Sequence, residues 1–297
     1  MRKIIIIFVI AALLGFTGCS LIKDISGDQT QQGIVDGQLK VHFIDVGQGD
    51  CIFIQTPTQN ILIDGGERGN AVVDYLKAEG VNELDMVIAT HPHSDHIGGL
   101  INVIESIEVK EVVDPAVVHT SKTFEDYLTL IDKKNIKFTQ GRAGMKKELG
   151  DGAVIEILHP TKPSKKHLND ASIVAKLTFG DISFMFTGDA EQYSEEQVLG
   201  KNYNLSSTVL KVGHHGSSTS SSTAFLEAVS PEVAVIMVGE DNDYGHPHDE
   251  VLERLAEEGT EVYRTDVHGT VVITTDGRTY DVWVSFDREG RAIQKAA

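Results

Sequence analysis

Short apolar runs alternate with turn residues along most of the chain, from about Leu39 to Val284. Runs of about four to eight residues that are bounded by Gly, Pro, Asn or Asp are typical of β-strands. Several longer segments between them are expected to be helices. A chain in which strands are interspersed with helices predicts an α/β fold built of packed layers.

The expected strands are residues 41–46, 51–55, 60–63, 85–89, 154–158, 172–178, 182–186, 208–212, 233–238, 270–274 and 279–284. The expected helices are residues 71–79, 97–104, 124–134, 223–229 and 249–258. Gly80 follows the first of these helices, where glycine readily adopts the left-handed conformation that ends a helix. The dipeptides Gly180-Asp181 and Asp276-Gly277 stand between consecutive strands and favour hairpin turns.

The N-terminal segment has a different pattern. A short positive region precedes an uninterrupted apolar run, Ile4–Phe16. A spanning helix needs about 20 apolar residues, so this run is more typical of a signal-peptide core than of a membrane anchor. The residues up to Cys19 resemble the lipobox of bacterial lipoproteins, in which the cysteine is lipidated, although Phe16 stands where Leu is usual.

These patterns divide the chain into four parts. We expect a lipoprotein-type signal peptide at 1–19, a flexible polar tether at 20–38, a folded domain at 39–286 and a polar tail at 287–297. The protein is then extracytoplasmic, and it is either lipid-anchored to the cell membrane or secreted. The membrane is contacted only through this anchor, and no protein partner is predicted.

Composition adds two constraints. The chain has 44 acidic and 26 basic residues, a formal net charge of −18, and 41% of its 297 residues are hydrophobic. Such a charge repels polyanions at long range, so a role with nucleic acid must overcome this repulsion. The second cysteine, Cys51, lies in an apolar run and is expected to be a buried core thiol.

The most specific chemical signal is the segment Thr90-His91-Pro92-His93-Ser94-Asp95-His96, which directly follows an expected buried strand. Imidazole and carboxylate are the ligands that borderline and hard divalent cations prefer. Pro92 removes a backbone donor and stiffens the loop. The alternative is a surface loop that happens to be rich in histidine.

A His-x-His-x-Asp-His pattern after a strand resembles the signature of the metallo-β-lactamase superfamily. The resemblance implies a single-domain, four-layer αββα sandwich with two divalent metal ions, and nitrogen and oxygen ligands without thiolate suit zinc or manganese. Asp64 matches the aspartate that braces the ligand loop. Asp189 matches the aspartate that bridges both metals, although it could instead be a turn residue.

One subgroup matches further. Segments 43–51, 169–172, 210–217 and 244–247 resemble the soluble hydrolase domain of ComEC-type DNA-uptake proteins, and the similarity extends over residues 39–286. Such proteins usually carry many membrane spans, and none is predicted after residue 16. We therefore expect a free-standing version of the domain, without membrane transport of DNA.

The chain departs from the superfamily pattern at the third histidine, because Asn169 occupies that region. The pair His214-His215 is inferred to supply the missing ligand of the first metal. The predicted ligands of the first metal are His91, His93, Asp189 and one of this pair, and those of the second are Asp95, His96, Asp189 and His246. The sequence does not decide within the pair. His214 is taken as the ligand and His215 as a proton donor to the leaving oxygen.

Five further histidines are expected to take no part in the site. His159 and His167 are expected to lie on loops and not to bind metal. The remaining three are His119, His248 and His268.

Two divalent ions that share a hydroxide lower the pKa of that water and stabilise a developing oxyanion. Asp95 is expected to orient the hydroxide, and Lys211 to steady a phosphate unless it is merely solvated. The run Ser217–Thr223 offers either donors to a phosphate or a helix N-cap. The predicted function is a phosphodiesterase or nuclease that cleaves DNA or another phosphate-bearing polymer. The alternatives are a metallo-hydrolase of a small ester or lactam, and a surface-tethered DNA-binding protein.

Overall fold

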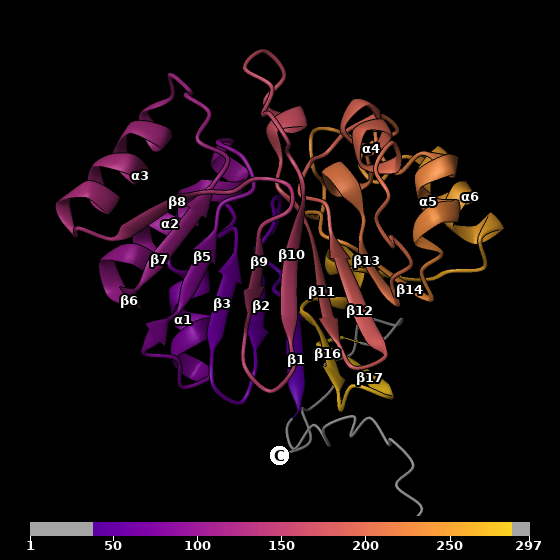
Figure 1. Cartoon of the computed structure of the whole chain (residues 1–297), viewed down its shortest axis with the longest axis horizontal. Coiled ribbons are helices and arrows are strands. Elements are labelled where there is room, and N and C mark those ends of the chain that lie inside the picture. The colour runs from indigo at the N-terminus through magenta and orange to yellow at the C-terminus, as the bar shows by residue number, and fades with distance from the viewer. Residues whose placement is uncertain (1–37, 287–297) are drawn as a thin grey trace, which may run out of the picture. The chain divides into compact units, whose positions relative to one another are not determined.

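Two mixed β-sheets lie face to face, and helices cover the outer side of each (Figure 1). The computed structural model describes residues 38–286. The predicted signal peptide at 1–19, the tether at 20–38 except its last residue, and the tail at 287–297 lie outside these residues.

The first sheet has eight strands in the order β17-β16-β1-β2-β3-β5-β7-β8. They are β1 (Leu39–Phe43), β2 (Ile52–Gln55), β3 (Asn60–Ile63), β5 (Met86–Ile88), β7 (Glu111–Asp114), β8 (Lys137–Gln140), β16 (Val271–Thr275) and β17 (Tyr280–Val284). β3, β5 and β7 are parallel to one another. A separate short pair joins β4 (Glu83–Leu84) to β6 (Glu108–Val109).

The second sheet has seven strands in the order β15-β14-β13-β12-β11-β10-β9. They are β9 (Lys146–Glu148), β10 (Val154–His159), β11 (Val174–Phe179), β12 (Ile182–Phe186), β13 (Val209–Lys211), β14 (Val233–Ile236) and β15 (Glu261–Arg264). β12 to β15 are parallel. β11 is antiparallel to both β10 and β12, so β10 runs in the same direction as β12.

Three helices cover the first sheet: α1 (Ala71–Ala78), α2 (Ser94–Ser106) and α3 (Lys122–Lys133). Three others cover the second: α4 (Gln192–Leu199), α5 (Thr223–Val229) and α6 (Asp249–Glu257). Short helical turns are η1 (Asn169–Ala171), η2 (Gly213–Gly216) and α7 (Thr265–His268). Among residues 38–286, no helix has the length and apolar character that crossing a membrane requires.

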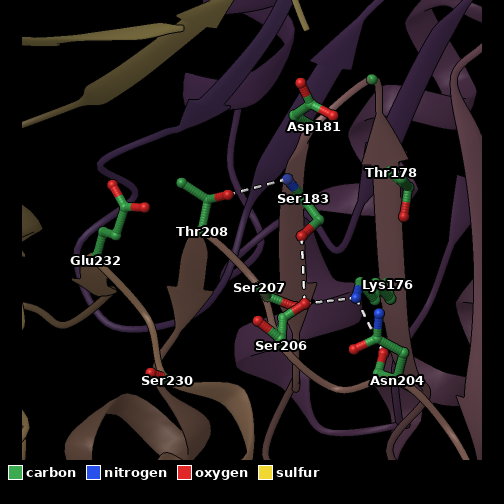
Figure 2. Close-up of a pocket in the computed structure, with 11 residues that line it drawn as sticks. Lys176, Thr178, Asp181, Ser183, Asn204, Ser206, Ser207, Thr208, Ser230 and Glu232 are labelled. Atoms are coloured by element: carbon green, nitrogen blue, oxygen red, sulfur yellow. Dashed lines mark hydrogen bonds between the residues drawn. The ribbon is translucent and has the colours of Figure 1, made fainter. Parts of the chain in front are cut away.

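The edge of the second sheet where β13 and β14 begin carries a polar hollow of about 390 Å³ (Figure 2). Its central cation, Lys176, donates to the backbone carbonyls of Asn204 at 3.0 Å and Ser206 at 2.5 Å. The Ser183 hydroxyl donates to the same Ser206 carbonyl. These polar groups bond to one another, so the hollow ties the segment before β13 to the sheet.

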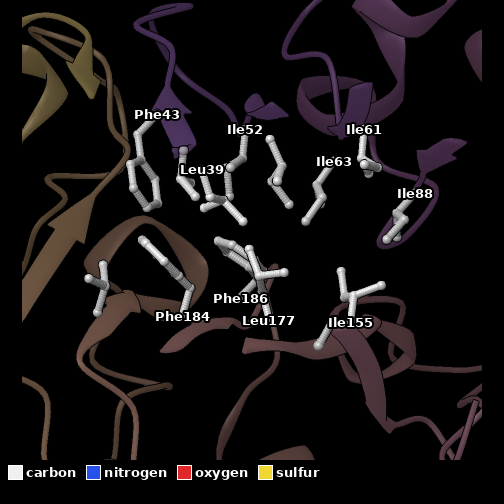
Figure 3. Close-up of a cluster of buried hydrophobic side chains, with 14 of the residues drawn as sticks. Leu39, Phe43, Ile52, Ile61, Ile63, Ile88, Ile155, Leu177, Phe184 and Phe186 are labelled. Atoms are coloured by element: carbon white, nitrogen blue, oxygen red, sulfur yellow. The ribbon is translucent and has the colours of Figure 1, made fainter. Parts of the chain in front are cut away.

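Three hydrophobic clusters fill the spaces between the layers. The central one joins the two sheets, and Figure 3 shows side chains such as Ile52 and Phe184 facing each other from opposite sheets. Because successive side chains of a strand point to opposite faces, Phe53 lies in the cluster beneath α1–α3 and Met185 in the cluster beneath α4–α6. Strands buried on both faces explain the continuous apolar runs. The predicted four-layer α/β sandwich is confirmed.

Several local predictions are also confirmed. The strands at 60–63 and 182–186 and the helix at 223–229 have the predicted bounds. Gly80, with φ +77°, ends α1 as predicted, and Cys51 is a fully buried thiol. α2 begins at Ser94, three residues earlier than predicted, which places Asp95 and His96 in its first turn.

Candidate metal centre

The predicted site residues leave one common edge of the two sheets. Asp64 follows the C-terminal end of β3, and His91 follows that of the parallel strand β5. In the second sheet, Asp189 and His214 follow the C-terminal ends of the parallel strands β12 and β13. Loops at the carboxyl ends of parallel strands are where α/β proteins place ligand sites.

Two groups of potential metal ligands share one carboxylate. His91, His93 and Asp189 form the first group, and Asp95, His96, Asp189 and His215 form the second. Within each group, the candidate ligand atoms lie within 4.8 Å of one another. Oδ2 of Asp189 is 3.6 Å from Nε2 of His91 and 3.2 Å from Nε2 of His96, so this carboxylate stands between the two groups.

Neighbouring acceptors fix the orientation of two imidazoles. Asp64 accepts hydrogen bonds from Nδ1 of His96 at 2.8 Å and from the hydroxyl and backbone N–H of Thr90. Nδ1 of His215 donates to the carbonyl of Met237 at 2.9 Å. In both rings, Nε2 therefore points toward the centre. An outer acceptor on Nδ1 orients metal-binding histidines in the same way.

Buried polar atoms at the centre lack hydrogen-bond partners among the described residues. They are Nε2 of His96, Nε2 of His215 and Oδ1 of Asp189. Each such atom costs about 1–3 kcal/mol if nothing binds it. Three unpaired nitrogen and oxygen atoms that converge on one spot match the donor set of a divalent metal ion.

The protonation of the centre is consistent with this interpretation. Burial raises the pKa of Asp189, but the imidazoles of His96 and His215 outweigh burial and hold it well below its usual value. Burial likewise lowers the pKa of His96, but the carboxylates of Asp189 and Asp95 raise it well above the usual value. The carboxylates thus attract cationic partners, and a divalent cation would displace the imidazole protons.

The His214-His215 pair has an unusual backbone. Both residues adopt left-handed conformations, with φ +48° and +54°. Such a conformation costs roughly 1–3 kcal/mol for a residue other than glycine and often occurs at functional sites. It aims the two neighbouring rings at different partners.

The structure distinguishes the two histidines of the pair by their positions. His215 is buried and belongs to the second group of ligands. Nδ1 of His214 lies 3.3 Å from Oε1 of Glu191, and its Nε2 lies 3.8 Å from Asp189, so His214 lies beside the ligand groups and belongs to neither. The geometry therefore favours His215 as the ligand and His214 as the proton donor.

His246 also differs from its predicted place. Its ring packs against His214 at a centroid distance of 5.6 Å, and it belongs to neither ligand group. Burial and the neighbouring His214 and His248 lower its pKa to about 4. His215 stands in the second group where His246 was expected.

Lys211 is fully buried, and neither of its predicted roles is observed. Its ammonium group lies 2.5 Å from Oδ2 of Asp50 and donates to the carbonyl of Gly188 at 3.0 Å. It does not line the pocket, so it cannot meet a phosphate there, and it is not solvated. Lys211 instead neutralises Asp50 beneath the site, a partnership that the sequence analysis missed.

A pocket of about 320 Å³ opens over the centre. It is lined by Gln48, His93, Ser94, Asp95, His119, Ser121, Asn169, Asp189, His214, His215, Tyr244 and His246. His119, given no role from the sequence, belongs to this lining because it follows β7, a strand that was not predicted. Glu191 was also missed, and only its position two residues after Asp189 could have indicated it.

The remaining candidates have structural positions. His159 ends strand β10 instead of lying on a loop, and its Nδ1 donates to the carbonyl of Ser172. Within the serine-rich run, the hydroxyl of Ser222 accepts from the backbone N–H of Phe225 and caps α5. The Thr219 hydroxyl contacts Glu191 beside the pocket.

Comparison with known proteins agrees with this architecture. Residues 44–240 match the sequence profile of the metallo-beta-lactamase superfamily. ComE operon protein 3 of Bacillus subtilis (strain 168) is 31% identical over 270 residues, which are 84% of this chain and 35% of that protein. Competence protein ComA of Neisseria gonorrhoeae is 31% identical over 244 residues, 81% of this chain and 33% of that protein. The chain thus spans about a third of the length of these relatives.

Solved structures share the fold at low sequence identity. The metallo-beta-lactamase fold protein YhfI from Bacillus subtilis superposes with a TM-score of 0.54 at 17% identity, covering 81% of this chain and all of that one. Igni18, a metallo hydrolase from Ignicoccus hospitalis, gives a TM-score of 0.52 at 20% identity, covering 78% and 98%. The chain belongs to the metallo-β-lactamase superfamily, because residues 44–240 match the superfamily profile and the fold agrees with it.

Proposed function

We propose that the protein is a dinuclear-metal phosphodiesterase that cleaves DNA or another phosphate-bearing polymer outside the cytoplasm. The observation that carries this proposal is the pair of histidine and aspartate groups that share Asp189, with three buried ligand atoms left unpaired. Zinc and manganese are the proposed metals, because every donor is nitrogen or oxygen.

The residues have distinct roles in the proposed reaction. Two divalent ions, when bound, would supply Lewis acidity and lower the pKa of a water molecule. His91, His93 and Asp189 would hold one ion, and Asp95, His96, Asp189 and His215 would hold the other. His214 is the proposed proton donor to the leaving oxygen, and its Nδ1 lies 3.3 Å from Oε1 of Glu191 beside the pocket.

The proposed substrate has two supports of different kinds. One of the two relatives is named as a competence protein, and a phosphodiester is a bond that a dinuclear metal centre can hydrolyse by in-line displacement. A net charge of −18 acts against long polyanions. It makes hydrolysis of a small ester or lactam the second outcome to test.

The test measures metal content and hydrolysis together. The full chain, purified in detergent and loaded with zinc or manganese, should bind two metal ions and hydrolyse bis(p-nitrophenyl) phosphate and single-stranded DNA. Asp189→Asn should lose both properties. Asp126→Asn makes the same charge change at an ion pair on the surface helix α3 and is the matched control. Two bound metals without hydrolysis of either phosphodiester would rule out the proposal and leave esters and lactams.

The proposed anchor is tested separately. If Cys19 is lipidated, mass spectrometry of the membrane fraction should find a diacylglyceryl group on the mature N-terminal peptide. Cys19→Ser should release the protein from that fraction or leave its precursor uncleaved. An unmodified Cys19 in mature, membrane-bound protein would exclude this anchor.

A further inference from the structure

A loop rich in lysine leads directly into the metal pocket. Residues 160–168 connect β10 to η1 and project beyond the strand ends in Figure 1. Lys162, Lys165 and Lys166 are exposed on this loop, and its next residue, Asn169, lines the pocket. The Ser164 hydroxyl accepts from the backbone N–H of His167 at 3.0 Å, which folds the loop into a turn.

These three lysines are available for an anionic ligand. The lysines that form ion pairs within residues 38–286 are Lys110, Lys122, Lys137, Lys146, Lys147 and Lys211. In a protein of net charge −18, the loop is therefore a local concentration of uncompensated positive charge beside the site. Lysine side chains are flexible, and their ammonium groups bind the phosphates of a nucleic-acid backbone.

The loop after β14, which contributes the pocket-lining residues Tyr244 and His246, carries the opposite charge. Glu240, Asp241 and Asp243 are exposed on the loop after β14, next to Tyr244. The Tyr244 side chain is 65% exposed, and its ring stacks on His246 with a centroid distance of 5.6 Å and an interplanar angle of 21°. Asn242 braces this loop, since its Oδ1 accepts from the backbone N–H groups of Tyr244 and His246.

Contacts among pocket-lining residues connect the lysine loop to the loop after β14. Asn169 Nδ2 is 3.4 Å from His214 Nε2, and the His214 ring packs against His246, which stacks on Tyr244. The order from the lysine loop to the acidic loop is therefore Asn169, His214, His246, Tyr244. The pocket volume of about 320 Å³ is at the lower end of the range for ligand sites, about 300–1,000 Å³. It offers room for about one monomer of a polymer.

We propose, on the basis of the proposed phosphodiesterase activity, that this site removes nucleotides from the end of a single strand of nucleic acid. The phosphates of the remaining chain lie on Lys162, Lys165 and Lys166, and the terminal base stacks on Tyr244. A chain that continued past Tyr244 would place its phosphates beside three carboxylates, and like charges disfavour that position. The difference in charge between the two loops thus allows the end of a strand to enter the pocket and disfavours a strand that continues through it.

The reaction is a hydrolysis in which all atoms are accounted for. A water oxygen forms a bond to the phosphorus of the last linkage, and the bond from that phosphorus to the sugar oxygen of the leaving group breaks. The leaving oxygen takes a proton from His214, one water proton replaces the proton on His214, and the other water proton is released. The products are a nucleotide and a strand shortened by one unit.

The first experiment compares linear with circular single-stranded DNA of equal length, using the full chain loaded with zinc or manganese. We expect mononucleotides as the earliest product from the linear strand and at least about 10-fold slower cleavage of the circle. Equal rates on both, or intermediate-length fragments at early times, would overturn the inference. Hydrolysis of bis(p-nitrophenyl) phosphate is measured in parallel. If the wild type cleaves neither this compound nor linear DNA, the proposed function itself is wrong and the inference falls with it.

The second experiment tests the lysine loop through salt dependence. Each phosphate contact to a single strand contributes about 0.7 to the slope of log affinity against log salt concentration. The triple substitution Lys162→Gln, Lys165→Gln and Lys166→Gln should raise KM for the linear strand and make this slope less steep by about 2. The control makes the same charge change with Gln at three exposed lysines outside this loop, Lys77 in α1, Lys133 in α3 and Lys201 just after α4. An unchanged slope in the loop variant would contradict phosphate binding there.

The base-stacking role of Tyr244 has its own test. Stacking of one base on an aromatic side chain contributes about 1–3 kcal/mol by alanine substitution. We therefore expect Tyr244→Ala to raise KM for the linear strand by about 10-fold or more and Tyr244→Phe, which keeps the ring, to restore it. Equal KM values for the alanine variant and the wild type would show that no base stacks there.

Discussion

The buried pair of Lys211 and Asp50 gives a test of how single charges support the site. Both side chains are at most 1% exposed, and their charged atoms are 2.5 Å apart. Removing one partner of a buried ion pair leaves an uncompensated charge and typically costs about 3–5 kcal/mol. Lys211→Met should therefore lower the free energy of unfolding by about that amount, as measured by urea denaturation.

A second variant separates this role from phosphate binding. Lys211→Met combined with Asp50→Asn removes both charges and should recover part of the lost stability. If Lys211 bound a substrate phosphate instead, the single variant would unfold like the wild type and would show only a higher KM.

Asp114 at the end of β7 predicts a pH-dependent stability. Burial raises its pKa to about 6, although its carboxylate accepts hydrogen bonds from the backbone N–H of Ala116 and from the Tyr127 hydroxyl. The folded state therefore binds this proton more tightly than the unfolded state does. The contribution to stability is full below about pH 4 and is lost as the pH rises through about 6.

Asp114→Asn removes this titration and keeps an acceptor for Ala116. Relative to the wild type, the variant should gain stability between about pH 4 and pH 7, by up to about 3 kcal/mol. Urea midpoints over this pH range measure the difference. Parallel pH profiles of the two proteins would refute the role given to Asp114.

At the residue scale, the sequence predicted those candidate metal ligands that lie close together along the chain. His91, His93, Asp95 and His96 lie within six positions, so their spacing alone predicted a shared metal site. The choice between His214 and His215 depends on two left-handed backbone conformations and on the carbonyl of Met237, the residue after β14. The residues around the pair do not indicate either feature.

At the scale of elements, buried segments were predicted better than exposed ones. The core strands β3 and β12 have the predicted bounds because their residues are nearly all apolar. The edge strands β9 (Lys-Lys-Glu) and β15 (Glu-Val-Tyr-Arg) were missed because they are rich in polar residues and none of their residues is fully buried. Helix α4 was missed for a similar reason, since its sequence, Gln-Tyr-Ser-Glu-Glu-Gln-Val-Leu, has few apolar residues.

The packing of α2 against the loop after β3 is expected to determine the positions of the candidate metal ligands in its first turn. Gly99 lies against the loop after β3, and a Cβ atom there would stand 1.9 Å from the carbonyl oxygen of Gly65. Gly99→Ala should therefore push the helix away from β3 and displace Asp95 and His96 in its first turn. We expect a loss of about 1–3 kcal/mol of stability and weaker metal binding, although alanine favours helices by up to about 1 kcal/mol over glycine.

The matched control is Gly69→Ala, because a Cβ atom at Gly69 meets nothing within 4 Å. Thermal unfolding and metal titration of both variants measure the effect. If Gly99→Ala gained stability from its better helix propensity, the close contact between α2 and Gly65 would not limit the packing of this helix.

At the scale of the whole domain, the metal centre joins the two halves of the sandwich. His91 and His93 lie in the loop after β5 of the first sheet and Asp95 and His96 in the first turn of α2, whereas Asp189 and His215 follow strands of the second sheet. The parallel strands explain this meeting, because their C-terminal ends lie at one edge. Sequence spacing could not show it, since about 100 residues separate the two sets of ligands along the chain.

A centre shared by both sheets makes metal binding a contribution to the stability of the whole fold. A ligand that binds only the folded state stabilises it by about 2.7 kcal/mol at 100 times its Kd. Chelation should therefore lower Tm by about 5–10 °C for a domain of this size. The unfolded chain keeps its local histidine cluster but not the approach of Asp189, so it should bind metal more weakly.

Asp189→Asn distinguishes stabilisation through the shared centre from a general effect of the chelator. Its amide removes the negative charge that belongs to both ligand groups, so the variant should begin with a lower metal affinity and its Tm should change little on chelation. Differential scanning calorimetry at several free zinc concentrations measures both proteins. A wild-type Tm that does not depend on zinc would mean that the imidazole protons of His96 and His215 already satisfy the buried carboxylates, and that the two sheets need no metal to stay together.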